Sequence, residues 1–271
     1  MLDIKEIQRN SEIIDINKIL NRADIIFADD KTSVVDLEKF QDKRRRMRGN
    51  YNTTSIKAIA QFVGSSIDKN SLDIDNPTCF IGEDGEAEVV LNFGNTEVPL
   101  HQDFTASISL KKTAVFNALS DIKDTRLRQR ELAEFIEDFH PHITAYTASY
   151  DEIDLSTAIN AIRDITIESS RKSQKTEEEY RDTSSAFTSV EAKFKDATPV
   201  FLKFNIPVFN EIDNKEFIFR ISVITANDEI ALSIRCAHWD QVLEEINLEF
   251  QNKLDNVLSP LGVRTFIGNW K

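Results

Sequence analysis

The chain has 271 residues, a net charge of −13 at pH 7 and 41% hydrophobic residues. This length supports one large domain or two smaller ones, and the balance of hydrophobic and charged residues is that of a globular protein rather than a disordered one. Only 7 Gly and 6 Pro are present, which argues against propellers, collagen-like repeats and glycine-rich nucleotide sites.

The N-terminal sequence MLDIKEIQRN carries acids and no apolar run, so we expect neither a signal peptide nor a transit peptide. No stretch approaches the roughly 18 apolar residues that a membrane-spanning helix requires. Cys79 and Cys236 form no disulfide framework and lack metal-ligand spacing. We therefore expect a cytoplasmic protein that makes no membrane contact and keeps both cysteines as thiols.

Apolar residues at helical spacing predict a helix over residues 1–22, and two short strands are expected over 23–28 and 33–37. A basic segment over 43–57 follows. No Asp or Glu occurs between positions 43 and 63, although the chain as a whole is acidic. This separation of charge is the largest electrostatic anomaly of the sequence.

A helix is expected directly after the basic segment, with Thr53 or Thr54 as its N-cap. The basic residues are then expected on a loop or a short extended piece in front of it. The residues of this helix that are expected to face inward are Ile56, Ile59, Ala60 and Val63.

Over 78–110 the period changes from helical to alternating, which predicts a half-buried antiparallel sheet with a turn at Asp84 and Gly85. In this sheet Asn92 is expected on the polar face. Thr113 is expected to cap a short helix, and a second helix is expected over 125–139, where Pro141 stops it.

A helix capped by Ser156 is expected over 156–168, followed by a second antiparallel block over 200–235 with a hairpin at Asn227 and Asp228. The longest apolar stripe of the chain predicts a helix over 238–258, with Glu244, Glu245, Glu249 and Asp255 outside it. A short strand over 263–267 closes the chain.

These elements predict an α+β fold, in which two antiparallel sheets are flanked by amphipathic helices. The stretch 169–185 contains a single apolar residue, Tyr180, and we expect a mobile polar arm there because it cannot bury enough surface to offset its ordering entropy. An N-terminal α+β lobe over 1–168 and a C-terminal sheet-plus-helix lobe over 186–271 are expected, either separate or packed as one domain.

No sequence motif for catalysis or for a cofactor is present: no nucleophile elbow, no phosphate-binding glycine loop and no zinc-protease helix. The best metal candidate is Asp138 with His140 and His142, to which His101 and Asp103 add remote ligands. An exposed turn around Pro141 is the simpler interpretation. We therefore expect no enzyme, no metal and no cofactor, and keep a metal-dependent hydrolase as the third hypothesis.

The basic segment is the one candidate contact site, and its members are Lys43, Arg44, Arg45, Arg46, Arg48 and Tyr51. Arginines grip phosphates through paired hydrogen bonds, and a tyrosine ring can stack on a base. The alternative is a network of salt bridges with acids of the same chain or of a neighbouring subunit. The sequence leaves both interpretations open.

Several blocks resemble the YfdQ-like family of phage and prophage proteins. They are LEKFQDKRRRMRGNYNTTSIKAIAQFV, VVLNFGNTEVPLHQDFTASISLKKTAVFNAL, RQRELAEFIEDF, AIRDIT, SSAFTSVEAKF and FIFRISV. Where relatives carry Pro-Gly-His, this chain has Pro99, Leu100 and His101, so a turn built on that glycine is not expected.

The resemblance implies an accessory protein of a temperate phage, with no enzyme activity. We expect a non-enzymatic protein that acts by binding in the cytoplasm of the bacterial host, as a homo-oligomer, on a host protein in host interaction or counter-defence. The second hypothesis is a nucleic-acid-binding accessory of phage recombination or replication that uses the basic segment.

Overall fold

The computed structural model describes residues 42–44, 46–67, 75–165, 198–226 and 229–270. The chain divides into two compact units, Met1–Met47 and Arg48–Lys271. The helix expected over 1–22, the strands expected before the basic segment and the arm expected over 169–185 lie outside the described residues. Among the described residues, no helix is long and apolar enough to span a bilayer.

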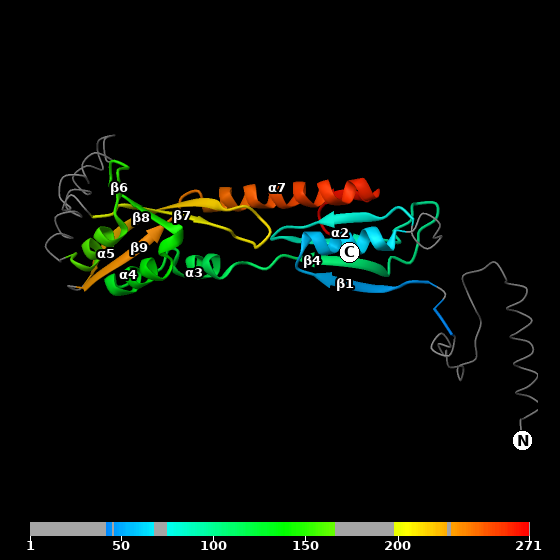
Figure 1. Ribbon diagram of the computed structural model, residues 1–271, viewed down its shortest axis with the longest axis horizontal. Helices are drawn as coiled ribbons and strands as arrows, with labels where there is room; N and C mark the ends of the chain where they lie inside the picture. Colours follow the sequence, from blue (N-terminus) through cyan, green and yellow to red (C-terminus); the bar gives the residue numbers. More distant parts are fainter. Residues whose placement is uncertain (1–41, 45, 68–74, 166–197, 227–228, 271) are drawn as a thin grey trace, which may run out of the picture. The chain divides into compact units, whose positions relative to one another are not determined.

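The first sheet of the larger unit has the strand order β1-β4-β3-β2-β10 (Figure 1). Strands β2, β3 and β4 are antiparallel, whereas the edge strands β1 and β10 run parallel to their neighbours β4 and β2. The bounds are β1 Gly49–Thr53, β2 Thr78–Ile81, β3 Glu86–Val90, β4 Phe104–Ser109 and β10 Arg264–Ile267.

The turn between β2 and β3 uses the expected pair, since Asp84 and Gly85 both have positive φ angles of 55° and 75°. Beyond β3 the alternation stops, and Asn92 is buried at 4% exposure rather than lying on the polar face. Its amide bridges the chain, because Oδ1 accepts from the N–H of Phe104 at 3.0 Å and Nδ2 donates to Asp103 Oδ1 at 3.0 Å. These bonds compensate its burial.

One face of the first sheet is covered by α2 (Ile56–Ser66) and α7 (Trp239–Leu258), which contact each other. The expected cap of α2 was wrong: Thr53 ends β1, and Ser55 is the N-cap, accepting from the N–H of Ala58 at 3.3 Å. The inward residues Ile56, Ile59 and Val63 are confirmed as buried, whereas Ala60 is half-buried.

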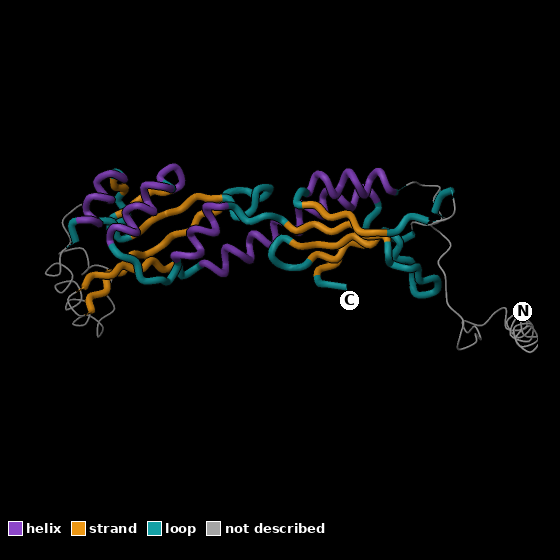
Figure 2. Tube along the Cα trace, turned by 90° about the horizontal axis from the view of Figure 1, so that it is seen from below, coloured by secondary structure: helices purple, strands orange, loops and turns teal. Residues whose placement is uncertain are grey.

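The second sheet has the order β6-β5-β7-β8-β9, with antiparallel pairing throughout. Figure 2 shows its helices alongside it. The strands are β5 Ile143–Tyr146, β6 Glu152–Ile153, β7 Phe201–Ile206, β8 Lys215–Ala226 and β9 Glu229–Arg235. The helices are α3 Ala114–Ile122, α4 Gln129–Asp138 and α5 Leu155–Arg163. The expected α+β class with two largely antiparallel sheets is confirmed.

Two helix starts differ from expectation. Helix α4 begins at Gln129 rather than near 125, because Leu127 exchanges two backbone hydrogen bonds with Leu232 of β9, at 2.8 and 2.7 Å. Helix α5 is capped by Asp154, whose carboxylate accepts from the N–H of Thr157 at 3.2 Å. Ser156 donates to the same carboxylate instead of capping.

Both sheets draw strands from both sides of residues 166–197. Strands β5 and β6 precede that segment and pair in the sheet of β7 to β9, while β10 returns from the C-terminus to pair with β2. Helix α7 contacts β8 in the second sheet and β10 in the first. Residues 48–271 accordingly form one compact unit.

Candidate functional site

Of the basic segment ahead of β1, which begins at Gly49, the described residues 43, 44 and 46–48 lie in no helix or strand. Lys43, Arg44 and Arg48 are exposed, and Arg46 is half-buried. Arg45 lies outside the described residues. Arg44, Arg46 and Arg48 each have an interaction partner. A salt-bridge role within the protein and phosphate binding are therefore both compatible with this geometry.

Tyr51 differs from the rest of the predicted site, because it lies in β1 and contributes to packing. Its ring stacks on that of Phe62 from α2, with centroids 4.4 Å apart and planes at 18°. One face of the Tyr51 ring is therefore occupied by the protein. A base could reach only the other face.

The residues considered for metal binding are spread over separate elements. His101 lies on the loop before β4, while His140 and His142 belong to the short 3-10 helix η2 (His140–His142) between α4 and β5. Within the described part of the chain, no three His, Cys, Asp or Glu side chains gather as metal ligands would. His140 Nδ1 instead lies 3.0 Å from the carbonyl oxygen of Glu137.

Cys236 and His238 are the one described thiol–imidazole pair, with Sγ 3.9 Å from either ring nitrogen. The imidazole is engaged, because its Nε2 accepts from the N–H of Ile218 at 3.3 Å. Burial raises the pKa of the Cys236 thiol, and burial with the nearby Asp255 raises that of Cys79 to about 12. Both groups stay protonated at neutral pH, which is the opposite of an activated thiolate.

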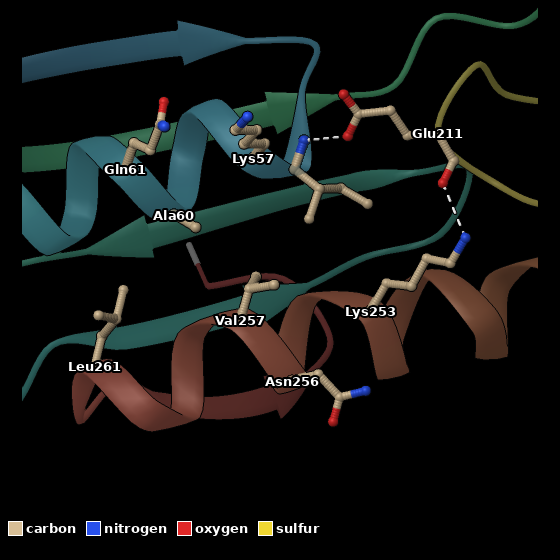
Figure 3. A pocket seen from close by; sticks show the side chains of 9 residues that line it. Lys57, Ala60, Gln61, Glu211, Lys253, Asn256, Val257 and Leu261 are labelled. Carbon is tan, nitrogen blue, oxygen red and sulfur yellow. Dashed lines mark hydrogen bonds between the residues drawn. The ribbon is translucent and has the colours of Figure 1, made fainter.

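A groove of about 670 Å³ opens between α2 and α7 (Figure 3). Its floor is apolar, with Ala60, Val257 and Leu261, and Lys57, Gln61 and Asn256 stand at its rim. At one end, Glu211 accepts from the N–H of Ile56 at 2.6 Å, and its carbonyl oxygen accepts from Lys253 Nζ at 3.1 Å.

The charges at this end of the groove are already paired within the chain. Glu249 on α7 receives Lys215 at 2.8 Å, Lys253 at 2.9 Å and the N–H of Asp213 at 2.9 Å. Lys253 also pairs with Asp213 at 3.1 Å. The cluster thereby fastens the β7–β8 connection to α7 and to the start of α2, which is a structural role.

The open face of the first sheet, opposite α2 and α7, carries a cluster of four aromatic residues. Phe80 stacks on Trp270 and on Phe266, with centroids 5.5 and 6.1 Å apart and planes at 22° in both pairs. Phe93 lies edge-on to Trp270 at 5.1 Å. Phe266 is 51% exposed and Trp270 49%, so the cluster presents ring surface to solvent.

Beside this aromatic cluster the face is polar and acidic. A hollow of about 380 Å³ runs from Phe80 and Trp270 to Glu86 and Glu88 on β3, with Ser107 and Ser109 on β4. Glu88 lies directly across from Phe80 in the β2–β3 register. From here on, "open face" means one set of eight residues on this side of the sheet: Phe80, Phe93, Phe266, Trp270, Glu86, Glu88, Ser107 and Ser109.

Sequence reasoning missed the open face because its residues come from separate parts of the chain. Phe80 and Phe266 are far apart in the chain and become neighbours only through the parallel pairing of β10 with β2.

Comparison with known proteins yields one match. A family model described as "Uncharacterized conserved protein (DUF2303)" matches residues 3–270. No curated protein and no solved structure matches the chain. The YfdQ-like and phage assignment stays a prediction at this finer level. Since the model spans nearly the whole sequence, the chain belongs to the DUF2303 family of uncharacterized conserved proteins.

Proposed function

We propose that the protein acts by binding another protein rather than by catalysis, and that the open face is its contact surface. The observation that supports this most is the exposure of Phe266 and Trp270 next to Glu86 and Glu88. Aromatic rings are enriched in the anchors of protein interfaces, and exposed apolar patches with a polar rim mark interaction sites.

The chemistry of the open face selects a basic partner. The exposed rings of Phe266 and Trp270 attract cations, and the two glutamates attract the same Lys or Arg side chains. The net charge of −13 adds long-range attraction for a basic protein and repels nucleic acid from this face. A partner segment that alternates apolar and basic residues would contact the aromatic cluster with its apolar side chains and the two glutamates with its basic ones.

The biological setting proposed is that of an accessory protein of a phage or prophage, which acts in the bacterial cytoplasm on a host protein in host interaction or counter-defence. This part of the proposal rests on the resemblance to YfdQ-like proteins. A homo-oligomer is proposed with it.

Reversing the charge of the open face should weaken binding. We expect Glu86→Lys with Glu88→Lys to weaken binding of short peptides that combine Lys or Arg with apolar residues by at least about tenfold, or roughly 1.4 kcal/mol. The direct measurement is a titration of the full chain with a panel of such peptides and with an acidic panel of equal length.

The matched control is Glu244→Lys with Glu245→Lys, two exposed positions of α7 that change the net charge by the same amount. This control should bind as the wild type does. The proposal fails if the control loses affinity equally, or if the wild type prefers the acidic panel or shows no preference for the basic one.

Nucleic-acid binding through the basic segment is the second candidate function. It is favoured by the exposure of Lys43, Arg44 and Arg48 within a stretch free of acids. Single-stranded DNA should then bind with a log–log salt slope of about −0.7 per phosphate contacted. Replacing Arg44, Arg45, Arg46 and Arg48 with Ala should flatten that slope and leave the fold intact.

The salt-bridge alternative for the basic segment predicts a different result. If the four arginines pair with acids of the protein, the wild type should bind no single-stranded DNA even at low salt. The quadruple variant should then lose stability or break into smaller species, as light scattering and thermal unfolding would show.

A further inference from the structure

We propose that β10 pairs with the β10 strand of a second copy of this chain, antiparallel about a two-fold axis at Phe266, so that two first sheets become one continuous sheet. The interface is the edge of the sheet, whereas the proposed function uses the open face. The inference thus rests on the homo-oligomer of the proposed function and assigns the interface that this homo-oligomer would use.

Among the described residues, no strand pairs with the outer side of β10. Arg264 N–H donates to Pro77 at 3.0 Å and Gly268 N–H donates to Ile81 at 2.8 Å, so the even-numbered residues face β2. Successive residues of a strand point their N–H and C=O groups to opposite sides. Those of Thr265 and Ile267 consequently point outward from the edge strand, where a further strand would bind.

This arrangement suits self-pairing in one register. With Phe266 opposite Phe266 of the second copy, Thr265 lies opposite Ile267 in both directions, and the outward groups of these two residues form hydrogen-bonded pairs. Phe266 then occupies a non-hydrogen-bonded site, where side chains are closest. Two-fold symmetry makes both halves of the contact identical.

The side chains of this edge are those that an interface would cover. Ile267 is 77% exposed and Phe266 51%. The one charged residue of β10, Arg264, donates to Thr78 Oγ1 on the neighbouring strand at 3.1 Å. The opposite edge of the same sheet, β1, is preceded by the basic segment, and charges of this kind deter edge pairing. Of the two described edges of this sheet, β10 is the one that combines outward amides with uncovered apolar side chains.

The stretch that carries this edge adds no acidic charge of its own to the contact. Copies with a net charge of −13 repel each other, but no Asp or Glu occurs from Asn256 to Lys271, where the charged residues are Arg264 and Lys271. In the two-fold register Arg264 lies opposite Gly268, so the two arginines do not meet.

Cysteine cross-linking tests the register directly. In a non-hydrogen-bonded antiparallel pair the Cα atoms are about 4.5 Å apart, which is within the range for a disulfide. Phe266→Cys should therefore form a covalent dimer on mild oxidation. Ile267→Cys is the matched control, because residue 267 lies opposite residue 265 of the second copy in this register. The Cα atoms of the two cysteines would then be roughly 8 Å apart, which is too far for a disulfide. The native Cys79 and Cys236 are buried and should not contribute.

The assembly itself is tested by sedimentation of the full chain. Ile267→Lys should raise the dimer dissociation constant at least tenfold, and Val98→Lys, at another exposed apolar position, should leave it unchanged. Both sites are exposed, so neither variant should impair folding, and circular dichroism checks this.

The inference is overturned if the wild type sediments as a monomer at micromolar concentration, if Ile267→Lys dimerises as the wild type does, or if Ile267→Cys cross-links as readily as Phe266→Cys. The Glu86→Lys and Glu88→Lys variant should still dimerise, because these residues lie two strands in from the edge. Loss of peptide binding without loss of the dimer, or the reverse, separates the two proposals.

Discussion

Replacing Trp239 with Ala should lower the free energy of unfolding by about 3–5 kcal/mol. Trp239 is 8% exposed, and its ring stacks on Phe116 of α3 at 5.2 Å and contacts Phe217 of β8 at 4.9 Å. Lys123 lies 5.4 Å from the centre of the same ring. The substitution leaves a cavity where α7, α3 and the second sheet meet, and denaturant titration at neutral pH measures its cost.

Trp270→Ala is the matched control for this prediction, because it removes the same side chain from a position that is 49% exposed. We expect a loss of about 1 kcal/mol or less there. Equal losses in the two variants would contradict the packing role assigned to the start of α7.

Acid should destabilise the protein through Glu249. Burial acts to raise the pKa of this carboxyl, but the hydrogen bonds from Asp213 N–H, Lys215 and Lys253 outweigh it and lower the pKa to about 2. A group whose pKa is lower in the folded state stabilises the fold above its unfolded pKa, near 4.3, and this stability is lost as the pH falls towards 2. The contribution is about 2–3 kcal/mol.

Glu249→Gln should therefore lose about 2–3 kcal/mol at pH 7 and almost nothing near pH 2, where wild-type Glu249 is itself becoming protonated. Urea titrations of both proteins across this pH range measure the difference. Glu244→Gln, at an exposed position of the same helix, should follow the wild type throughout. A Glu249→Gln variant that keeps the full acid dependence of the wild type would contradict the assignment.

Strong local patterns predicted most of the fold. The helix expected over 238–258 is α7, because six residues of one stripe are buried along it. The alternation over 200–235 gives β7 to β9 for the same reason. In both cases the spacing of the apolar side chains along the chain indicates which face is buried, and this spacing can be read from neighbouring residues alone.

Features that depend on contacts between distant segments could not be predicted from the sequence. Strand β1 was not expected, because its sequence GNYNT has little apolar alternation and it is held by parallel pairing with β4. Glu249 was expected outside the α7 stripe, yet its side chain is only 17% exposed, because Lys215 and Lys253 partner it. Neither position could be read from its own neighbours in the chain.

The candidate sites likewise include features that follow from local sequence and features that depend on distant contacts. The position of Lys43, Arg44 and Arg48 on a loop ahead of the first described helix was predicted from the sequence, whereas the stacking of Tyr51 on Phe62 depends on how β1 meets α2. The open face depends entirely on the return of β10 to β2, so its four rings carried no common signal in the sequence.

The most direct test of the central claim compares what the open face captures. Wild type, the Glu86→Lys and Glu88→Lys variant, and the Glu244→Lys and Glu245→Lys control are immobilised in parallel and exposed to one bacterial lysate, with quantitative mass spectrometry as the readout. We predict a basic protein that is enriched on the wild type and the control and absent from the open-face variant, and that protects amides of β2 and β3 from hydrogen exchange. Capture that does not differ among the three proteins, or protection that falls elsewhere, would contradict the proposal.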